Sequence, residues 1–225
     1  MKTIKRFFAI AMCLILAFSF STTSLAQSDV SVDEESETPP IVSETEPMPD
    51  DEVAIIHLCA IPLGGYFIFG HAWIYIENIS ENDIQVGAYT LPAGKSVSVG
   101  TSSFAGKNGF KLYYNLETLI EKDTDYVSIG DTISTNELDA MNKKILSFNH
   151  WDPIINCTFS SSAIWNTVSD KTLIPMVFPI FSMIQMWIHG NDDEFKMNEP
   201  ESGTIYVQKG FGKNATIKPV DENQL

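Results

Sequence analysis

The 225 residues include 29 Asp and Glu against 14 Lys and Arg, and the formal net charge is −15 at pH 7. Nucleic acids and anionic membrane surfaces bind basic faces, so this charge excludes both as expected partners. Because 44% of the residues are hydrophobic and only three are cysteines, we expect a core that forms without disulfide bonds.

The first 26 residues have the three regions of a secretory signal peptide. Three basic residues precede an apolar run over residues 7–20, and Ser24-Leu25-Ala26 places small residues at both positions that define a cleavage site. The apolar run is shorter than the ~20 residues that a membrane span needs. Cys13 lies inside the run, whereas a lipidated cysteine would follow it. We therefore expect residues 1–26 to be removed and the mature protein to be secreted or displayed at the cell surface, without a stable membrane span.

Residues 27–52 have the composition of a disordered acidic tether. They contain ten acidic residues, no Lys or Arg and no aromatic residue. Such a segment buries too little apolar surface to become ordered, and its like charges repel one another. Without the signal peptide the chain keeps 11 basic and 29 acidic residues, a formal net charge of −18.

The composition changes at Val53, and we expect one folded domain over residues 53–225. Strand-like runs are separated by turn residues, and residues 95–100 alternate polar residues with Val, as in a half-exposed strand. This pattern predicts an antiparallel meander. The predicted strands are 53–61, 66–79, 84–91, 95–100 and 127–133.

Two amphipathic helices are predicted in the second half. Ser134-Thr135-Asn136-Glu137 has the spacing of a capping box, and apolar residues then recur at helical spacing as far as Phe148. Asn156-Cys157-Thr158 begins a second helix and places Cys157 in its first turn. The fold class predicted from these elements is α+β.

Residues 172–188 are strongly apolar, and a helix there is expected to begin near Pro179 and run toward Trp187. We interpret it as a core or lid helix; contact with a membrane or a partner is the alternative. A closing hairpin is predicted from residues 204–207 and 215–217.

Cys157 is the candidate nucleophile. Unpaired N–H groups and the positive dipole end of a helix favour thiolate over thiol. Cys59 lies in an apolar strand, where burial raises the pKa of a thiol. The sequence leaves open whether Cys59 and Cys157 form a disulfide.

A thiolate nucleophile needs an imidazole, and four histidines are available: His57, His71, His150 and His189. Gly70-His71-Ala72-Trp73 places His71 at the start of a strand, directly after a glycine. A strand end is rigid enough to orient a ring, so His71 is our preferred candidate for the base.

These motifs resemble those of the circularly permuted branch of papain-like, NlpC-type cysteine hydrolases, in which the strand histidine precedes the helix cysteine. The resemblance covers residues 53–170 and is carried by the His71 motif, by Asn156-Cys157-Thr158-Phe159 and by Ile164-Trp165-Asn166. It implies a papain-like fold, an antiparallel sheet or half-barrel packed against the helix that bears the cysteine. It also implies that Cys157 and His71 act on amides, often in cell-wall peptides.

The chain departs from that family at two positions. The residue that orients the histidine is expected on the following strand, where the candidates are Tyr89, Gln85 and Thr90, with Tyr89 preferred. Trp151 stands where the papain pattern has a glutamine as oxyanion donor, so backbone N–H groups of Cys157 and a neighbour would have to serve.

Three functions follow as hypotheses. The first is a secreted thiol hydrolase or acyl-transfer enzyme acting on a peptide or cell-wall-type amide. The second is a non-catalytic surface or binding module with a degenerate papain-like fold. The third is a membrane-associated partner protein that uses residues 172–188 as a contact surface. We expect no cofactor and no metal, because the carboxylates of Asp192-Asp193-Glu194 beside His189 have the composition of a solvated loop. The sequence indicates neither the substrate nor an oligomeric state.

The N-terminal pattern predicts that the protein recovered outside the cytoplasm begins at or near Gln27. Intact-mass measurement of the exported protein tests this expectation. A full-length chain that still carries Met1 would contradict it.

Overall fold

The computed structural model describes residues 51–61, 70–102, 111–120, 124–148, 156–198, 200 and 203–220. All of them belong to one compact unit, residues 47–225. The predicted signal peptide and the predicted tether as far as residue 50 lie outside the described residues. The first described strand begins at Glu52, one residue before the predicted start of the domain.

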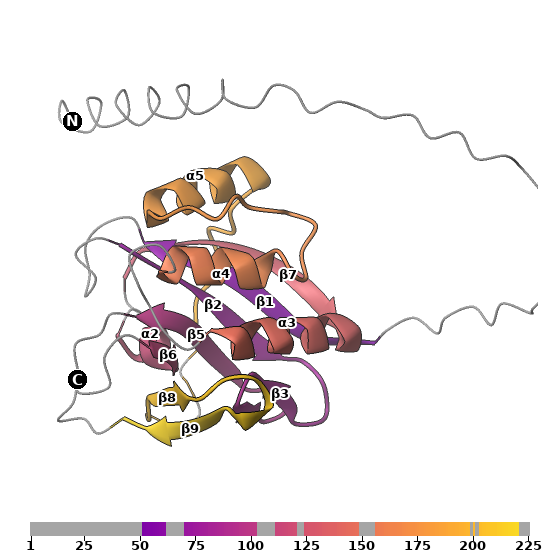
Figure 1. Ribbon diagram of the computed structural model, residues 1–225. Coiled ribbons are helices and arrows are strands. Elements are labelled where there is room, and N and C mark those ends of the chain that lie inside the picture. Colours follow the sequence, from indigo (N-terminus) through magenta and orange to yellow (C-terminus); the bar gives the residue numbers. More distant parts are fainter. Residues whose placement is uncertain are drawn as a thin grey trace, which may run out of the picture. The chain divides into compact units, whose positions relative to one another are not determined.

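A seven-stranded antiparallel sheet is the centre of the fold (Figure 1). Its strand order is β7-β1-β2-β5-β6-β8-β9, so β7 returns to pair with β1 while the C-terminal hairpin extends the opposite edge. The strands are β1 (Glu52–Ile61), β2 (His71–Asn78), β5 (Ser96–Ser102), β6 (Lys111–Tyr114), β7 (Val127–Ser134), β8 (Tyr206–Lys209) and β9 (Thr216–Pro219). The predicted α+β class with an antiparallel sheet is confirmed.

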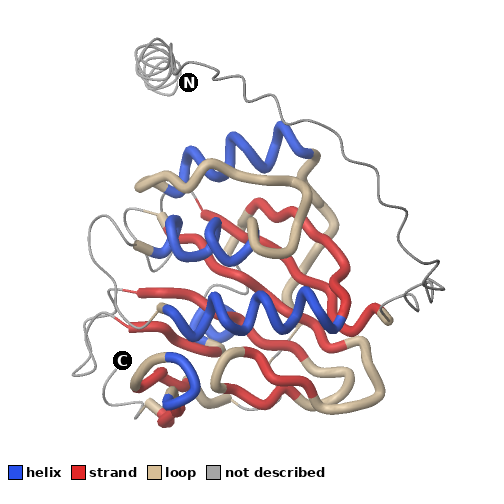
Figure 2. The backbone as a smooth tube through the Cα atoms, turned by 45° about the vertical axis from the view of Figure 1, so that its right-hand side comes forward, coloured by secondary structure: helices blue, strands red, loops and turns tan. Residues whose placement is uncertain are grey.

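Three helices cover one face of this sheet: α3 (Thr135–Ser147), α4 (Cys157–Trp165) and α5 (Pro179–His189) (Figure 2). All three were predicted, and α3 begins with the predicted capping box, in which Ser134 and Glu137 bond each other's backbone N–H groups. No helix within the described ranges is long and apolar enough to cross a membrane.

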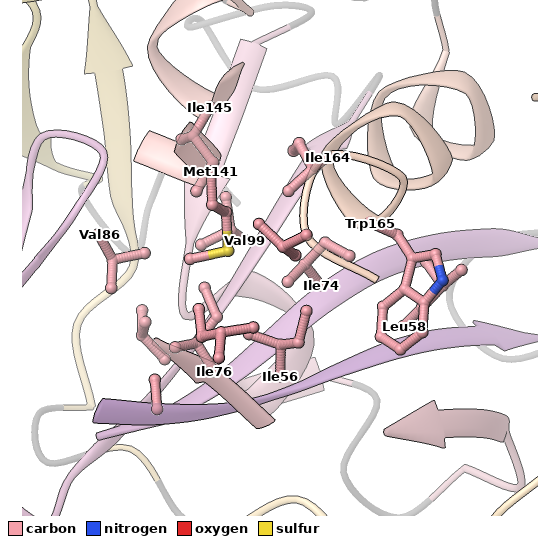
Figure 3. Close-up of a cluster of buried hydrophobic side chains, with 14 of the residues drawn as sticks. Ile56, Leu58, Ile74, Ile76, Val86, Val99, Met141, Ile145, Ile164 and Trp165 are labelled. Atoms are coloured by element: carbon pink, nitrogen blue, oxygen red, sulfur yellow. The ribbon is translucent and has the colours of Figure 1, made fainter. Parts of the chain in front are cut away.

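The main core lies between the three helices and the helical face of the sheet, where alternate side chains of the strands face the helices. Ile56 and Leu58 of β1 and Ile74 and Ile76 of β2 share this face, because side chains of a strand point alternately to opposite sides. Figure 3 shows strand residues such as Ile74 and Val99 facing residues of α3 and α4. The labelled helix residues are Met141, Ile145, Ile164 and Trp165.

The other face of β1 and β2 is also covered. Cys59, Trp73 and Tyr75 pack there with Met197, and the partly buried rings of Tyr126 and Phe195 close over them. Because both faces are covered, the central strands lose the half-exposed character expected of antiparallel strands. The prediction that residues 95–100 form a half-exposed strand is therefore wrong, since every residue of β5 is buried.

Residues 84–91 are not one strand, as predicted, but two. β3 (Ile84–Val86) and β4 (Tyr89–Leu91) form a separate antiparallel hairpin, in which Gly87 turns the chain with a φ of 59°. The predicted meander is accordingly interrupted, and β2 pairs with β5 instead of the next strand in the sequence. β6 and the short helix α2 (Leu116–Ile120) were not predicted.

The capping box of α3 provides a test of the fold. Ser134→Ala removes the hydroxyl that accepts from the Glu137 backbone N–H, and we expect a loss of about 1 kcal/mol in the free energy of unfolding. Thermal unfolding followed by circular dichroism would then show a fall in Tm of about 2–4 °C. Ser147→Ala, at the exposed end of the same helix, is the control. Equal effects of the two substitutions would contradict the capping role.

Candidate active site

Cys157 is the first residue of α4, as predicted. The preceding Asn156 caps the helix, because its side-chain oxygen accepts a hydrogen bond from the backbone N–H of Phe159 at 3.1 Å. Cys157 is 8% exposed as a residue, so it lies almost buried at the start of the helix. The capped helix end thus places a thiol beside backbone N–H groups and the positive end of the helix dipole.

His71 is the first residue of β2 and follows Gly70, whose φ of 83° favours glycine. The ring is 1% exposed. Helix α4 packs directly on this strand end: the Ser161 hydroxyl donates to the Ala72 carbonyl at 3.0 Å, and the Ala72 N–H donates to the Cys157 sulfur. The structure therefore brings together the two residues that the sequence singled out, which hydrogen-bond through their side chains.

Glu117, on α2, is the third member of the cluster. Nε2 of His71 lies 2.8 Å from Oε1 of Glu117, and the Glu117 side chain is fully buried. Since Nε2 is engaged by Glu117, the other ring nitrogen, Nδ1, is the one left for Cys157. Imidazole thus bridges a thiol and a carboxylate, the arrangement that converts a cysteine into a nucleophile with an oriented base.

Cys157 and His71 each favour the charged form of the other. Burial alone would raise the pKa of Cys157, but His71 and, to a lesser degree, the Ala72 N–H and the Thr158 hydroxyl lower it below its usual value. Burial alone would lower the pKa of His71, but Cys157 and Glu117 raise it above its usual value. Both shifts favour a thiolate and imidazolium pair over the neutral pair.

Backbone geometry places Glu117 beside the ring. Asn115 precedes α2 with a φ of 63°, and its N–H donates to the Ser98 carbonyl at 3.0 Å. The Thr118 N–H bonds the Ser98 hydroxyl at 3.3 Å, so α2 is tied to β5. On β5, Gly100 leaves the space that the Glu117 carboxylate occupies, because a Cβ on Gly100 would overlap Oε1.

The candidates predicted to orient His71 lie elsewhere, so that expectation is wrong. Tyr89, Gln85 and Thr90 belong to the β3–β4 hairpin, where Gln85 donates to the Thr90 hydroxyl and Tyr89 stacks near Tyr114. The prediction assumed that residues 84–91 form the next strand of the sheet, whereas β2 lies between β1 and β5. Glu117 gave no sequence signal, because nothing local links it to a residue 46 positions away.

The other predicted residues have different surroundings. Both described cysteines are free thiols, and burial raises the pKa of Cys59, as expected. His57 stacks on Phe195 with ring centroids 3.6 Å apart, and burial lowers its pKa to about 4, against an opposing effect of Asp192. His189 is exposed at the end of α5. His150 and Trp151 lie outside the described residues.

Gly100→Ala tests whether Glu117 acts through its contact with His71. The added methyl group displaces the carboxylate, which lowers the pKa of His71 and so raises that of Cys157. We expect alkylation of Cys157 by iodoacetamide at neutral pH to slow by up to about tenfold per pKa unit. Gly203→Ala is the control, since a Cβ there meets nothing within 4 Å. An unchanged rate in a folded Gly100→Ala protein would contradict the role of this contact.

Comparisons of the chain with protein-family models, with curated proteins and with solved structures find no match. The resemblance to permuted NlpC-type hydrolases therefore stays a prediction from the motifs around His71 and Cys157.

Proposed function

We propose that the protein is a secreted thiol hydrolase or acyl-transfer enzyme that acts on an amide bond. Cys157 is the nucleophile, His71 is the acid and base, and Glu117 positions His71 and favours its charged form. The observation that carries the proposal is the buried cluster in which the His71 ring contacts both the Cys157 sulfur and the Glu117 carboxylate. Perturbed pKa values with specific charge partners are typical of catalytic sites.

The first half of the reaction forms a thioester. The Cys157 thiolate attacks the carbonyl carbon of the substrate, and a carbon–sulfur bond forms. The His71 imidazolium then gives its proton to the amide nitrogen, the carbon–nitrogen bond breaks, and the amine leaves. The sulfur needs no separate activation step, since both pKa shifts already favour the ion pair.

The second half releases the acyl group. Neutral His71 takes a proton from a water molecule, whose oxygen attacks the thioester carbon; the carbon–sulfur bond then breaks and returns the thiolate. An amine or alcohol in place of water would make the same step an acyl transfer. The sum is amide plus water giving acid plus amine, with Cys157 and His71 restored.

The negative oxygen of the tetrahedral intermediates needs donors, and the start of α4 offers them. Among the described residues, none accepts a hydrogen bond from the backbone N–H of Cys157. This N–H group is adjacent to the attacking sulfur, as the oxyanion donor of a cysteine hydrolase must be. It offers a donor that does not depend on the side chain of Trp151.

Glu117 has two separable effects on His71 in this scheme. Its oxygen accepts from Nε2 and thereby holds Nδ1 toward the sulfur, and its negative charge favours the imidazolium. Papain-like enzymes use a neutral amide for the first effect alone. The order of histidine before cysteine and the helix packed on an antiparallel sheet support a permuted papain-like architecture.

Labelling kinetics test the proposed roles. We expect iodoacetamide to mark Cys157 before Cys59 at about pH 6–7, because the pKa of Cys157 is lowered and that of Cys59 is raised. As the pH falls through the lowered pKa of Cys157, the thiolate is protonated and the rate falls. His71→Ala removes the cation, so labelling at about pH 6 slows about tenfold or more and recovers at about pH 9–10. Peptide mapping by mass spectrometry measures each rate.

Matched variants separate the structural and chemical contributions. Glu117→Gln keeps an oxygen that accepts from Nε2 and is expected to slow labelling less than Glu117→Ala does. His189→Ala, which changes an exposed histidine, is the control for loss of any imidazole. Slow labelling of Cys157 that is indifferent to His71 would overturn the hydrolase and favour the non-catalytic binding module.

A further inference from the structure

A short apolar ledge, residues 174–178, lies exposed between α4 and α5 (Figure 1). Ile174 is 70% exposed, Val177 43% and Phe178 59%. Solvent-exposed apolar side chains that cluster in this way mark interaction sites more often than isolated ones do. The ledge is therefore a candidate interaction site.

Side-chain amides fix the backbone where the ledge begins. Asn166 bonds both the N–H and the carbonyl of Leu173, at 2.8 and 2.5 Å. Gln185 does the same for Ile174, at 2.7 and 3.1 Å. These four bonds satisfy the backbone groups of Leu173 and Ile174 and hold the first residue of the ledge in place. Preorganised groups lose less entropy on binding.

The ledge is tied to the candidate active site by Asn156. Nδ2 of Asn156 donates to the Val177 carbonyl at 2.6 Å, while Oδ1 of the same side chain caps α4. The next residue along the chain is Cys157. Asn156 thus holds the backbone of Val177 beside the start of the helix that carries Cys157, and the exposed residues Val177 and Phe178 belong to the segment bonded there.

The composition of the ledge favours an uncharged ligand group. Residues 172–188 contain no Asp, Glu, Lys or Arg, so a charged group would lose water there without gaining an ion pair. An apolar group would instead release water from both surfaces. The ledge therefore favours a neutral, apolar ligand group.

We infer that Val177 and Phe178 are specificity-determining residues that bind an apolar group of the substrate close to the reacting carbonyl. The inference rests on the proposed function, because it assigns the substrate class of the same site. An alkyl chain and an apolar amino-acid side chain offer the same chemistry. Both sources are compared in the test.

The test uses alkylating probes that differ only in the group attached to the iodoacetamide nitrogen: none, n-hexyl or phenethyl. We expect Cys157 to react about tenfold faster with at least one substituted probe than with iodoacetamide, with saturation kinetics. A faster hexyl probe indicates an alkyl chain as the source, and a faster phenethyl probe an aromatic side chain. Rates are measured by intact mass.

Phe178→Ser and Val177→Ser should remove this selectivity and leave the iodoacetamide rate unchanged. Phe178 is the N-cap residue of α5 and makes no side-chain cap bond, so Ser is compatible with the helix start. Ile188→Ser, which changes a residue 77% exposed at the other end of α5, is the control. Selectivity that survives both ledge substitutions would overturn the inference.

The design distinguishes this inference from the proposed function. Rapid labelling by iodoacetamide that depends on His71, without preference for apolar probes, would overturn only the specificity of the ledge. A ledge that pairs with a second copy of the chain, or binds neutral lipid vesicles, would also overturn it. Sedimentation with and without phosphatidylcholine vesicles measures both kinds of association. Either case would appear as association that Phe178→Ser abolishes, in a protein that shows no preference for the substituted probes.

Discussion

The contact between His71 and Glu117 is the constraint that the candidate site depends on. Both side chains are almost or fully buried, and a buried carboxylate is costly unless a cation and hydrogen bonds offset its lost hydration. The missing side chain of Gly100 provides room for the carboxylate, and the turn at Asn115 aims α2 toward the strand end. Glu117 is one negative neighbour of the His71 ring, and the Cys157 sulfur, which α4 places at the ring, is the second.

The sheet end combines elements from both sides of the fold. Helix α4 packs on the helical face of the sheet and carries Cys157. The side chain of Val99 belongs to the core on that face, so the next residue, Gly100, faces the opposite side. The Glu117 carboxylate lies on that opposite side, in the space beside Gly100. His71 stands at the first position of β2, between the two. A residue at a strand end can contact partners from both faces of the sheet, which a mid-strand residue such as His57 cannot. His57 is instead enclosed by Phe195 and its own sheet.

Much of the fold was predictable where the signal is local. The capping box at Ser134, the proline that begins α5 and the glycine before His71 each act within a few residues, and each stands where it was expected. Errors arose where strand pairing is decided over distance. Residues 84–91 read as one strand, but the turn at Gly87 folds them into a hairpin that leaves the sheet, and β5 takes their place beside β2. The orienting residue was therefore sought on the wrong strand.

The sequence by itself determined that Cys157 begins a capped helix and that His71 begins a strand after a glycine, because capping and backbone freedom depend on neighbours in the chain. It also determined the charge and the apolar character of residues 172–188. Only the tertiary structure decided which histidine meets Cys157, that Glu117 supports it, and that the ledge is tied to the same helix start through Asn156. These pairings join residues 21 to 86 positions apart, and no local preference encodes them; they follow from the order of strands and from which faces the helices cover.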